Sequence, residues 1–292
     1  MNIFFRKRKK NIPFLCYTVF YFVFLFGCTN HNNRIKVSDA TICYSYSDLG
    51  YILIPISEGK YFFIDTGAEM SFILSDRLNI NAVDVGTAWV NGKEKLPLKR
   101  VDSLQIGDLL ITNNDFVFGI AENSFLGKEP TKDTTIVGMI GMDILSQKYC
   151  YFDIENQTIT FSDEKISKTA SPSLVFSYKS PERPLGDLYI NDILFEDVLF
   201  DTGFNLFFKL RETDKEKLTK QAMIRQDTNY DFFGNYLLTF HEQFDSLSID
   251  GVLFSDKEMS YGQKYRLLGM EFIKHWSIFM INPFKMEIEF YL

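Results

Sequence analysis

The chain has 292 residues, 46% of them hydrophobic, with 31 basic against 38 acidic side chains and a net charge of −7. That hydrophobic fraction can fill a core, which excludes a disordered or collagen-like chain, and the acidic balance argues against nucleic acid as a partner, because phosphate neutralisation needs a clustered positive surface. Three His give little material for metal chemistry, so we expect no metal and no cofactor.

The N-terminal segment has the pattern of an export signal. Five basic residues at 6–10 precede an apolar run at 12–26, which is about 15 residues long and shorter than the roughly 20 that a membrane-spanning helix needs. The stretch from Leu25 to Cys28 resembles the lipobox of bacterial lipoproteins. This resemblance implies a signal peptide at residues 1–27 and a lipid anchor on Cys28. An uncleaved anchor is the alternative, and both place the remainder outside the cytoplasm.

Residues 28–39 predict a flexible tether, because they are polar, rich in Asn and without periodicity. Without residues 1–27 the chain keeps 26 basic against 38 acidic residues, a net charge of −12. Thr29 after the lipidated cysteine resembles lipoproteins sent to the outer membrane, so we expect a lipid-anchored protein of the bacterial cell envelope, at the outer membrane. Cys43 and Cys150 either form a disulfide or stay buried thiols, and the sequence favours neither decisively.

Beyond the tether, the chain has the pattern of an all-β protein. Short runs rich in Ile, Val, Phe and Tyr, such as 51–56, 61–64 and 111–120, recur between clusters of Gly, Asn, Asp and Pro. Helical periodicity is scarce, and the charged stretch at 211–221 predicts one surface helix. A segment rich in Ser, Lys and Pro, placed at 166–186, predicts a linker between two halves.

Three motifs occur twice in the same order, which indicates a duplicated domain. The segments 62–67, 102–106 and 139–145 are echoed by 198–203, 245–249 and 267–273, at offsets of 136, 143 and 128. The unequal offsets mean that the elements are shared while the loops differ in length. We therefore expect an N-terminal lobe at 40–165 and a C-terminal lobe at 187–292.

Each half carries three apolar β-formers followed by Asp-Thr-Gly, a pattern that predicts a buried strand ending in a tight turn with the Asp displayed. The motifs are Asp65-Thr66-Gly67 and Asp201-Thr202-Gly203, and the later apolar-Gly pairs are Ile140-Gly141 and Leu268-Gly269. Each apolar-Gly pair predicts a second strand lying against the first. An approximate two-fold between the halves would bring the two Asp side chains face to face.

These motifs resemble those of the aspartic proteases, whose lobes each carry an apolar pair before Asp-Thr-Gly and a later apolar-apolar-Gly. The group with the greatest similarity is the retropepsin-like aspartyl proteases of bacterial lipoproteins, and the two lobes in one chain resemble the pepsin arrangement. The resemblance implies an all-β, bilobal fold with two homologous β-barrel-like lobes around a central cleft. It also implies a monomeric aspartic endopeptidase that hydrolyses peptides or unfolded proteins without a cofactor.

By the same resemblance, Asp65 and Asp201 form the catalytic dyad. Two carboxylates about 3 Å apart cannot both ionise, so they share a proton and can activate a water for attack on a peptide carbonyl. Thr66 and Thr202 are expected to make reciprocal hydroxyl-to-backbone contacts that join the two loops. Ala68 follows the first motif as the family predicts, whereas Phe204 follows the second, where a small residue or a hydroxyl is usual.

The family also covers its substrate with a β-hairpin flap. The candidates are the hairpin predicted by Asn91-Gly92, with Trp89 before it, and the stretch around Phe233 in the second half. His241-Glu242 begins like a zinc-protease motif but lacks the second His, so no metal is expected there. A peptide-binding lipoprotein without catalytic activity on the same scaffold is the alternative function.

Overall fold

The computed structural model describes residues 35–74, 77–90, 94–119, 135–167, 170–218, 223–230, 236–262 and 264–292, and residues 35–292 form one compact unit. Strands make up 62% of the described residues and helices 5%, so the all-β prediction is confirmed. Cys28 and the predicted signal peptide lie outside the described residues. No helix among the described residues is both long and apolar enough to cross a membrane.

The first half contains twelve strands and one short helix within the described residues. They are β1 (Lys36–Val37), β2 (Ala40–Cys43), β3 (Ser45–Tyr46), β4 (Ile52–Ser57), β5 (Lys60–Ile64), β6 (Phe72–Leu74), β7 (Val83–Val90), β8 (Glu94–Ile106), β9 (Leu109–Gly119), β10 (Thr135–Ile140), α1 (Met142–Leu145), β11 (Tyr149–Asp153) and β12 (Thr158–Ser162).

The second half repeats this series with ten strands and two short helices within the described residues. They are β13 (Leu174–Ser180), β14 (Arg183–Ile190), β15 (Ile193–Phe200), β16 (Phe208–Arg211), the 3-10 helix η2 (Glu212–Asp214), β17 (Met223–Tyr230), β18 (Tyr236–Ile249), β19 (Val252–Gly262), β20 (Arg266–Leu268), α2 (Met270–Ile273), β21 (Ile278–Asn282) and β22 (Glu287–Tyr291).

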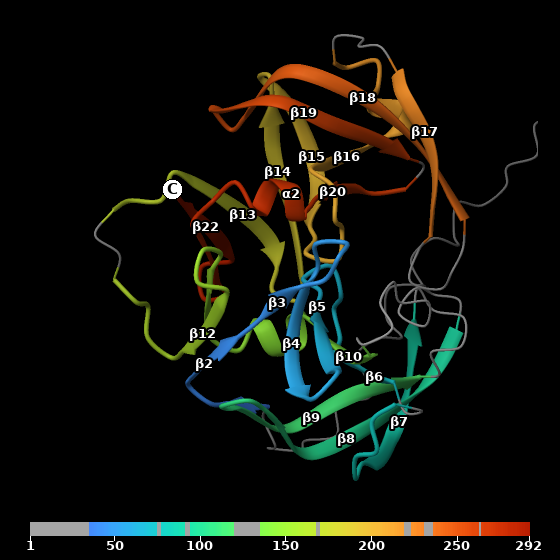
Figure 1. Ribbon diagram of the computed structural model, residues 1–292, viewed down its shortest axis with the longest axis vertical. Coiled ribbons are helices and arrows are strands. Elements are labelled where there is room, and N and C mark those ends of the chain that lie inside the picture. Colours follow the sequence, from blue (N-terminus) through green and yellow to red (C-terminus); the bar gives the residue numbers. More distant parts are fainter. Residues whose placement is uncertain are drawn as a thin grey trace, which may run out of the picture. The chain divides into compact units, whose positions relative to one another are not determined.

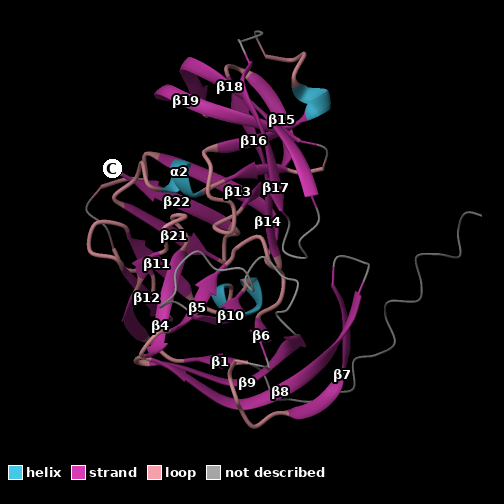
Figure 2. Cartoon of the chain, turned by 45° about the vertical axis from the view of Figure 1, so that its right-hand side comes forward, coloured by secondary structure: helices cyan, strands magenta, loops and turns pink. Residues whose placement is uncertain are grey.

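The two halves share one sheet order, which is the structural form of the sequence repeat. Neighbouring strands run β4-β5-β10-β6-β9-β8-β7 in the first half and β14-β15-β20-β16-β19-β18-β17 in the second. In the second half Ile190 of β14 also pairs with Ile249 of β18, which closes the strands into a ring. In Figures 1 and 2, β18 and β19 lie at one end of the described unit and β7, β8 and β9 at the other.

Strands from both halves meet in a further group of six, in the order β13-β22-β21-β11-β12-β2. The two halves join where β11 pairs antiparallel with β21, with Cys150 opposite Ile281. This group includes β13, so the predicted linker at 166–186 contains a complete strand and the start of β14. β13 has alternating apolar residues and pairs with β22. The Ser, Lys and Pro content of the segment does not reveal this strand.

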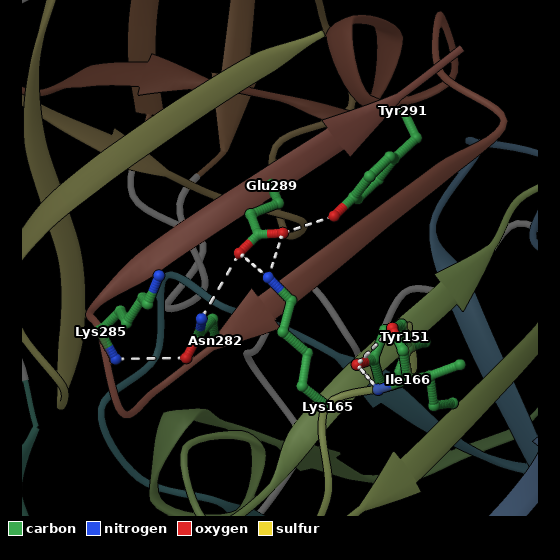
Figure 3. Close-up of polar contacts among 7 residues, drawn as sticks. All are labelled: Tyr151, Lys165, Ile166, Asn282, Lys285, Glu289 and Tyr291. Atoms are coloured by element: carbon green, nitrogen blue, oxygen red, sulfur yellow. Dashed lines mark hydrogen bonds and ion pairs between the residues drawn. The ribbon is translucent and has the colours of Figure 1, made fainter. Parts of the chain in front are cut away.

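A buried carboxylate network stabilises this six-stranded group, as Figure 3 shows. Glu289 of β22 is 3% exposed and accepts hydrogen bonds from Lys165 Nζ at 2.7 and 2.8 Å. Asn282 and Tyr291 also contact this carboxylate. Because Lys165 belongs to the first half and Glu289 to the second, the ion pair connects the segment after β12 to β22 of the other half.

The structure also bears on the predicted tether, the predicted surface helix and the two cysteines. The predicted tether extends to residue 39, but Lys36–Val37 already pairs with β9 as β1. The predicted surface helix at 211–221 is only the single turn η2 over its described residues, since Asp214 is buried and holds Arg266. Cys43 is exposed, Cys150 is buried, and both are free thiols.

Candidate active site

Two strand ends place the two Asp residues, one in each half. β5 pairs in parallel with β10, with Ile64 opposite Ile140, and β15 pairs in parallel with β20 in the same register. The backbone N–H of Asp65 donates to Ile140 O at 3.0 Å, and that of Asp201 donates to Leu268 O at 2.9 Å. The predicted second strand beside each Asp motif is therefore present, and it fixes where each Asp leaves the sheet.

The carboxyl group of each Asp lies against the turn of the other half. A Cβ atom placed on Gly67 would be 2.7 Å from Cγ of Asp201, and one on Gly203 would be 2.8 Å from Cγ of Asp65. No side chain fits at these distances, so the two glycines are required by the close approach of the carboxyls. Each glycine N–H also donates to Oδ1 of its own Asp at 2.8 Å.

The two threonines join these turns through four buried hydrogen bonds. Thr66 Oγ1 donates to Phe200 O at 2.8 Å and accepts from the N–H of Thr202 at 3.0 Å. Thr202 Oγ1 donates to Ile64 O at 2.9 Å and accepts from the N–H of Thr66 at 3.0 Å. Both threonines are 0% exposed, so the expected reciprocal contact is present and water does not compete for it.

The surroundings shift the acidity of the pair. Burial raises the pKa of Asp65 well above its usual value, and the charge of Asp201 and the hydrogen bond between the two carboxyls raise it further. Burial also raises the pKa of Asp201, while the Asp65 hydrogen bond, the Gly203 N–H and the cations Arg183 and Lys209 lower it. These cations favour the ionised form of Asp201, and the two carboxyls share a proton as one pair.

The apolar-Gly motifs support the Asp loops from behind. Met142 N–H donates to Ala68 O at 2.9 Å, and Met270 N–H donates to Phe204 O at 2.7 Å. A Cβ on Gly141 would be 2.8 Å from Ala68 O, and one on Gly269 would be 2.5 Å from Phe204 O. Each glycine therefore lets its loop pack directly on the strand end, and Phe204 keeps the backbone contact that Ala68 makes.

The departure in the second loop is local. The side chain of Phe204 lies beside Gly269, with Cδ1 only 2.5 Å from where a Cβ would stand. In the first loop Ser71 Oγ accepts the N–H of Gly141 at 3.0 Å and donates to Asp143 at 2.6 Å. In the second loop the N–H of Gly269 instead donates to Phe207 O at 3.1 Å. A backbone carbonyl thus replaces the missing hydroxyl.

The flap candidates lie in or beside two hairpins. β7 pairs with β8, and Trp89 is opposite Lys95, while residues 91–93 between the two strands lie outside the described residues. Trp89 is 67% exposed, whereas Ala88 and Val90 pack on a buried apolar cluster beside the dyad. That cluster comprises Tyr51, Leu53, Phe63, Phe72, Leu74, Val117, Ile136 and Met139. Phe233, between β17 and β18, also lies outside the described residues.

Four residues near the dyad were not singled out from the sequence. Tyr51 and Phe72 belong to the first half, and Arg183 and Lys209 belong to the second. Burial and the charges of both Asp residues raise the pKa of Tyr51. The sequence repeat alone does not identify them, because the halves must be aligned by strand register and not by a constant offset.

No group of metal-binding side chains occurs among the described residues, and His241 instead contacts Glu258 through Nδ1 at 2.6 Å. His275 is exposed, and its ring contacts the buried Trp276 edge-on with ring centroids 5.3 Å apart. The chemistry that the described site can carry is acid–base chemistry on two carboxyls.

Comparison with known proteins adds information on the fold alone. No family model and no curated protein matches the chain. Among solved structures, the basic 7S globulin from soybean is similar, with a TM-score of 0.50 and 10% sequence identity. The match covers 88% of this chain and 95% of the globulin chain, so the likeness extends over both halves.

Proposed function

We propose that the two halves are the two lobes of an aspartic-protease fold and that the chain is an aspartic endopeptidase. The observation that carries the proposal is that Asp65 and Asp201 lie at equivalent strand ends, each against the glycine of the other half, in loops joined by the reciprocal threonine contacts. The soybean globulin, which has a pepsin-like fold, supports the architecture and not the activity.

In this mechanism, the ionised Asp201 accepts a proton from a water that attacks the peptide carbonyl carbon. Asp65 donates its proton to the carbonyl oxygen, so the intermediate is a neutral gem-diol. Collapse breaks the C–N bond, the leaving amine takes up a proton from Asp201, and Asp65 regains one from the gem-diol. Water and a peptide bond are thereby converted into a carboxylic acid and an amine, with no covalent intermediate.

The test is hydrolysis of unfolded protein at mildly acidic pH by the full chain, purified in detergent. Asp65→Asn and Asp201→Asn should each abolish cleavage, whereas Asp102→Asn, which removes an exposed carboxylate from β8, should leave it intact. Cleavage that persists in both dyad variants would contradict the proposal. A statine-type inhibitor should bind the wild type because it resembles the gem-diol.

The alternative, a peptide-binding protein without catalytic activity, is supported by one departure, Phe204 at the position of Ala68. It predicts that the full chain binds the statine-type compound and peptides yet releases no new termini from unfolded protein. The same assay therefore separates the two functions.

The proposed location is the outer membrane of a bacterial envelope, reached through a lipid on Cys28. Cells fed labelled palmitate should incorporate the label into the wild-type chain and not into a Cys28→Ser variant. Labelling of that variant would contradict the lipid anchor.

A further inference from the structure

Lys209 in the second half occupies the position that Phe72 holds in the first. Phe72 of β6 pairs with Met139 of β10 and Val117 of β9. Lys209 of β16 pairs with Leu267 of β20 and with Ser260 of β19. Met139 and Leu267 are equivalent, because each lies opposite the residue two positions before the Asp of its half.

The two side chains also extend along the same path. A Cβ on Gly119, at the end of β9, would be 2.2 Å from Cζ of Phe72. A Cβ on Gly262, at the end of β19, would be 2.6 Å from Cε of Lys209. A glycine therefore makes room for the far end of the side chain in both halves, for a ring in the first and an ammonium group in the second.

The ammonium group of Lys209 has no protein partner in the described part of the chain. Lys209 is 8% exposed, and neither a hydrogen bond nor an ion pair to its Nζ is found among the described residues. Burial lowers the pKa of Lys209, the charge of Asp201 raises it, and that of Lys264 lowers it again. Nζ is not one of the fully buried atoms without a partner, so it reaches solvent, and an anion that bound there would form a charge-assisted contact with it.

A second pair of equivalent positions has the same asymmetry. In the first half, Tyr51 lies two residues before Leu53, which pairs with Phe63, two positions before Asp65. In the second half, Arg183 lies two residues before Leu185, which pairs with Leu199, two positions before Asp201. Arg183 forms an ion pair with Glu69 of the other half at 3.9 Å, whereas Lys209 forms none among the described residues. The first-half side of the dyad is thus apolar and aromatic, and the second-half side is cationic.

We propose that Lys209 selects substrates that carry an Asp or Glu side chain at the substrate position that lies beside Lys209 in the second half. The symmetric position, beside Phe72, takes an apolar side chain because its surroundings are the apolar cluster around Tyr51 and Phe63. This inference rests on the proposed peptidase function and names the substrate class of that same site.

The experiment compares cleavage by the full chain in detergent. A peptide library digested by the wild type and read by mass spectrometry first identifies the acidic position. Matched peptides with Glu or Gln there are then compared at pH 5.5, where the Glu is ionised. A charge-assisted hydrogen bond predicts a preference for Glu of about tenfold to a hundredfold in kcat/KM. The preference should fall below about pH 4.3 as the substrate Glu gains a proton.

The decisive variant is Lys209→Met, which keeps the apolar stem and removes the charge. It should abolish the Glu-over-Gln preference, and Lys209→Arg should retain part of it. Lys285→Met, at an exposed position in the β21–β22 turn, is the matched control and should keep the full preference. Binding of an uncharged statine-type inhibitor by Lys209→Met shows that the variant is folded.

Several results would overturn the inference while leaving the peptidase proposal intact. One is cleavage by the wild type with no acidic position in the library. Another is a Lys209→Met variant with an altered pH profile for both peptides and an unchanged Glu-to-Gln ratio, because Lys209 would then act only on Asp201. If nothing is cleaved, the peptidase proposal fails, and calorimetry with the same two peptides decides this inference. Tighter binding of the Glu peptide, lost in Lys209→Met, would support it, and equal binding would refute it.

Discussion

Replacing Thr66 by Val should destabilise the protein far more than replacing it by Ser. Val keeps the shape of Thr and removes the hydroxyl, which leaves the Phe200 carbonyl and the Thr202 N–H unpaired in a site with no solvent access. Each unsatisfied buried group costs about 1–3 kcal/mol, so the expected loss in the free energy of unfolding is about 2–6 kcal/mol. Ser keeps both hydrogen bonds and loses one methyl group, at a cost of about 1 kcal/mol.

The assay is urea unfolding of residues 29–292, which contain the whole compact unit, followed by circular dichroism. Thr160→Val is the matched control, because the Thr160 hydroxyl forms an exposed hydrogen bond with the Thr41 hydroxyl at 3.0 Å, and its loss should change stability by less than about 0.5 kcal/mol. The double variant of Thr66 and Thr202 should lose less than the sum of the single variants, since the hydrogen bonds form one network.

The Val and Ser variants would refute this reasoning if they unfolded within about 0.5 kcal/mol of each other. That result would mean that the hydroxyls contribute nothing beyond filling space. The loops would then be held together by strand pairing alone, and the proposed dyad would lose the contact that aligns its two carboxyls.

Three other predictions use the buried ionisable groups and the thiols. Because the pKa of Asp65 is raised in the folded state, the wild type binds a proton more tightly than the unfolded chain, and its stability should fall as the pH rises above about 3.8. Asp65→Asn should therefore have a higher melting temperature than the wild type at pH 7 and lose that advantage below pH 4; an unchanged melting temperature at pH 7 would contradict it. Burial alone would raise the pKa of Glu289, but Lys165, Tyr291 and Asn282 together lower it, so its contribution is present above about pH 4.5 and lost as the pH falls. Glu289→Gln should cost about 2 kcal/mol at pH 7 and less at pH 3, measured by urea unfolding, and a cost independent of pH would be evidence against the ion pair. Of the two thiols in residues 35–292, Cys43 should react with a maleimide in the native protein and Cys150 only after denaturation, because burial protects the Cys150 thiol and raises its pKa.

Much of the fold can be predicted from the sequence because the repeat and the strand pattern are local. Alternating and continuous apolar runs identify strands such as β4, β5 and β9 within a few residues of their observed ends. The Asp-Thr-Gly motif predicts the tight turn after each strand, because its glycine leaves room for the Asp carboxyl of the other half. The six-stranded group could not be predicted in this way, because its pairing is set by contacts between residues more than 120 positions apart, as between β11 and β21.

The second half shows why the rest of the site is hidden from the sequence. The offset of 136 that aligns Asp65 with Asp201 carries Phe72 onto Phe208, so the two halves would have the same residue at this position. The strand registers instead place Lys209 opposite the partners equivalent to those of Phe72, which means that the loop after Asp201 is one residue longer. One residue added to the loop shifts the following strand by one position, so the residue that would have faced away takes the place facing the partners. That insertion exchanges an aromatic ring for an ammonium group beside the dyad, and pairing geometry alone reveals it.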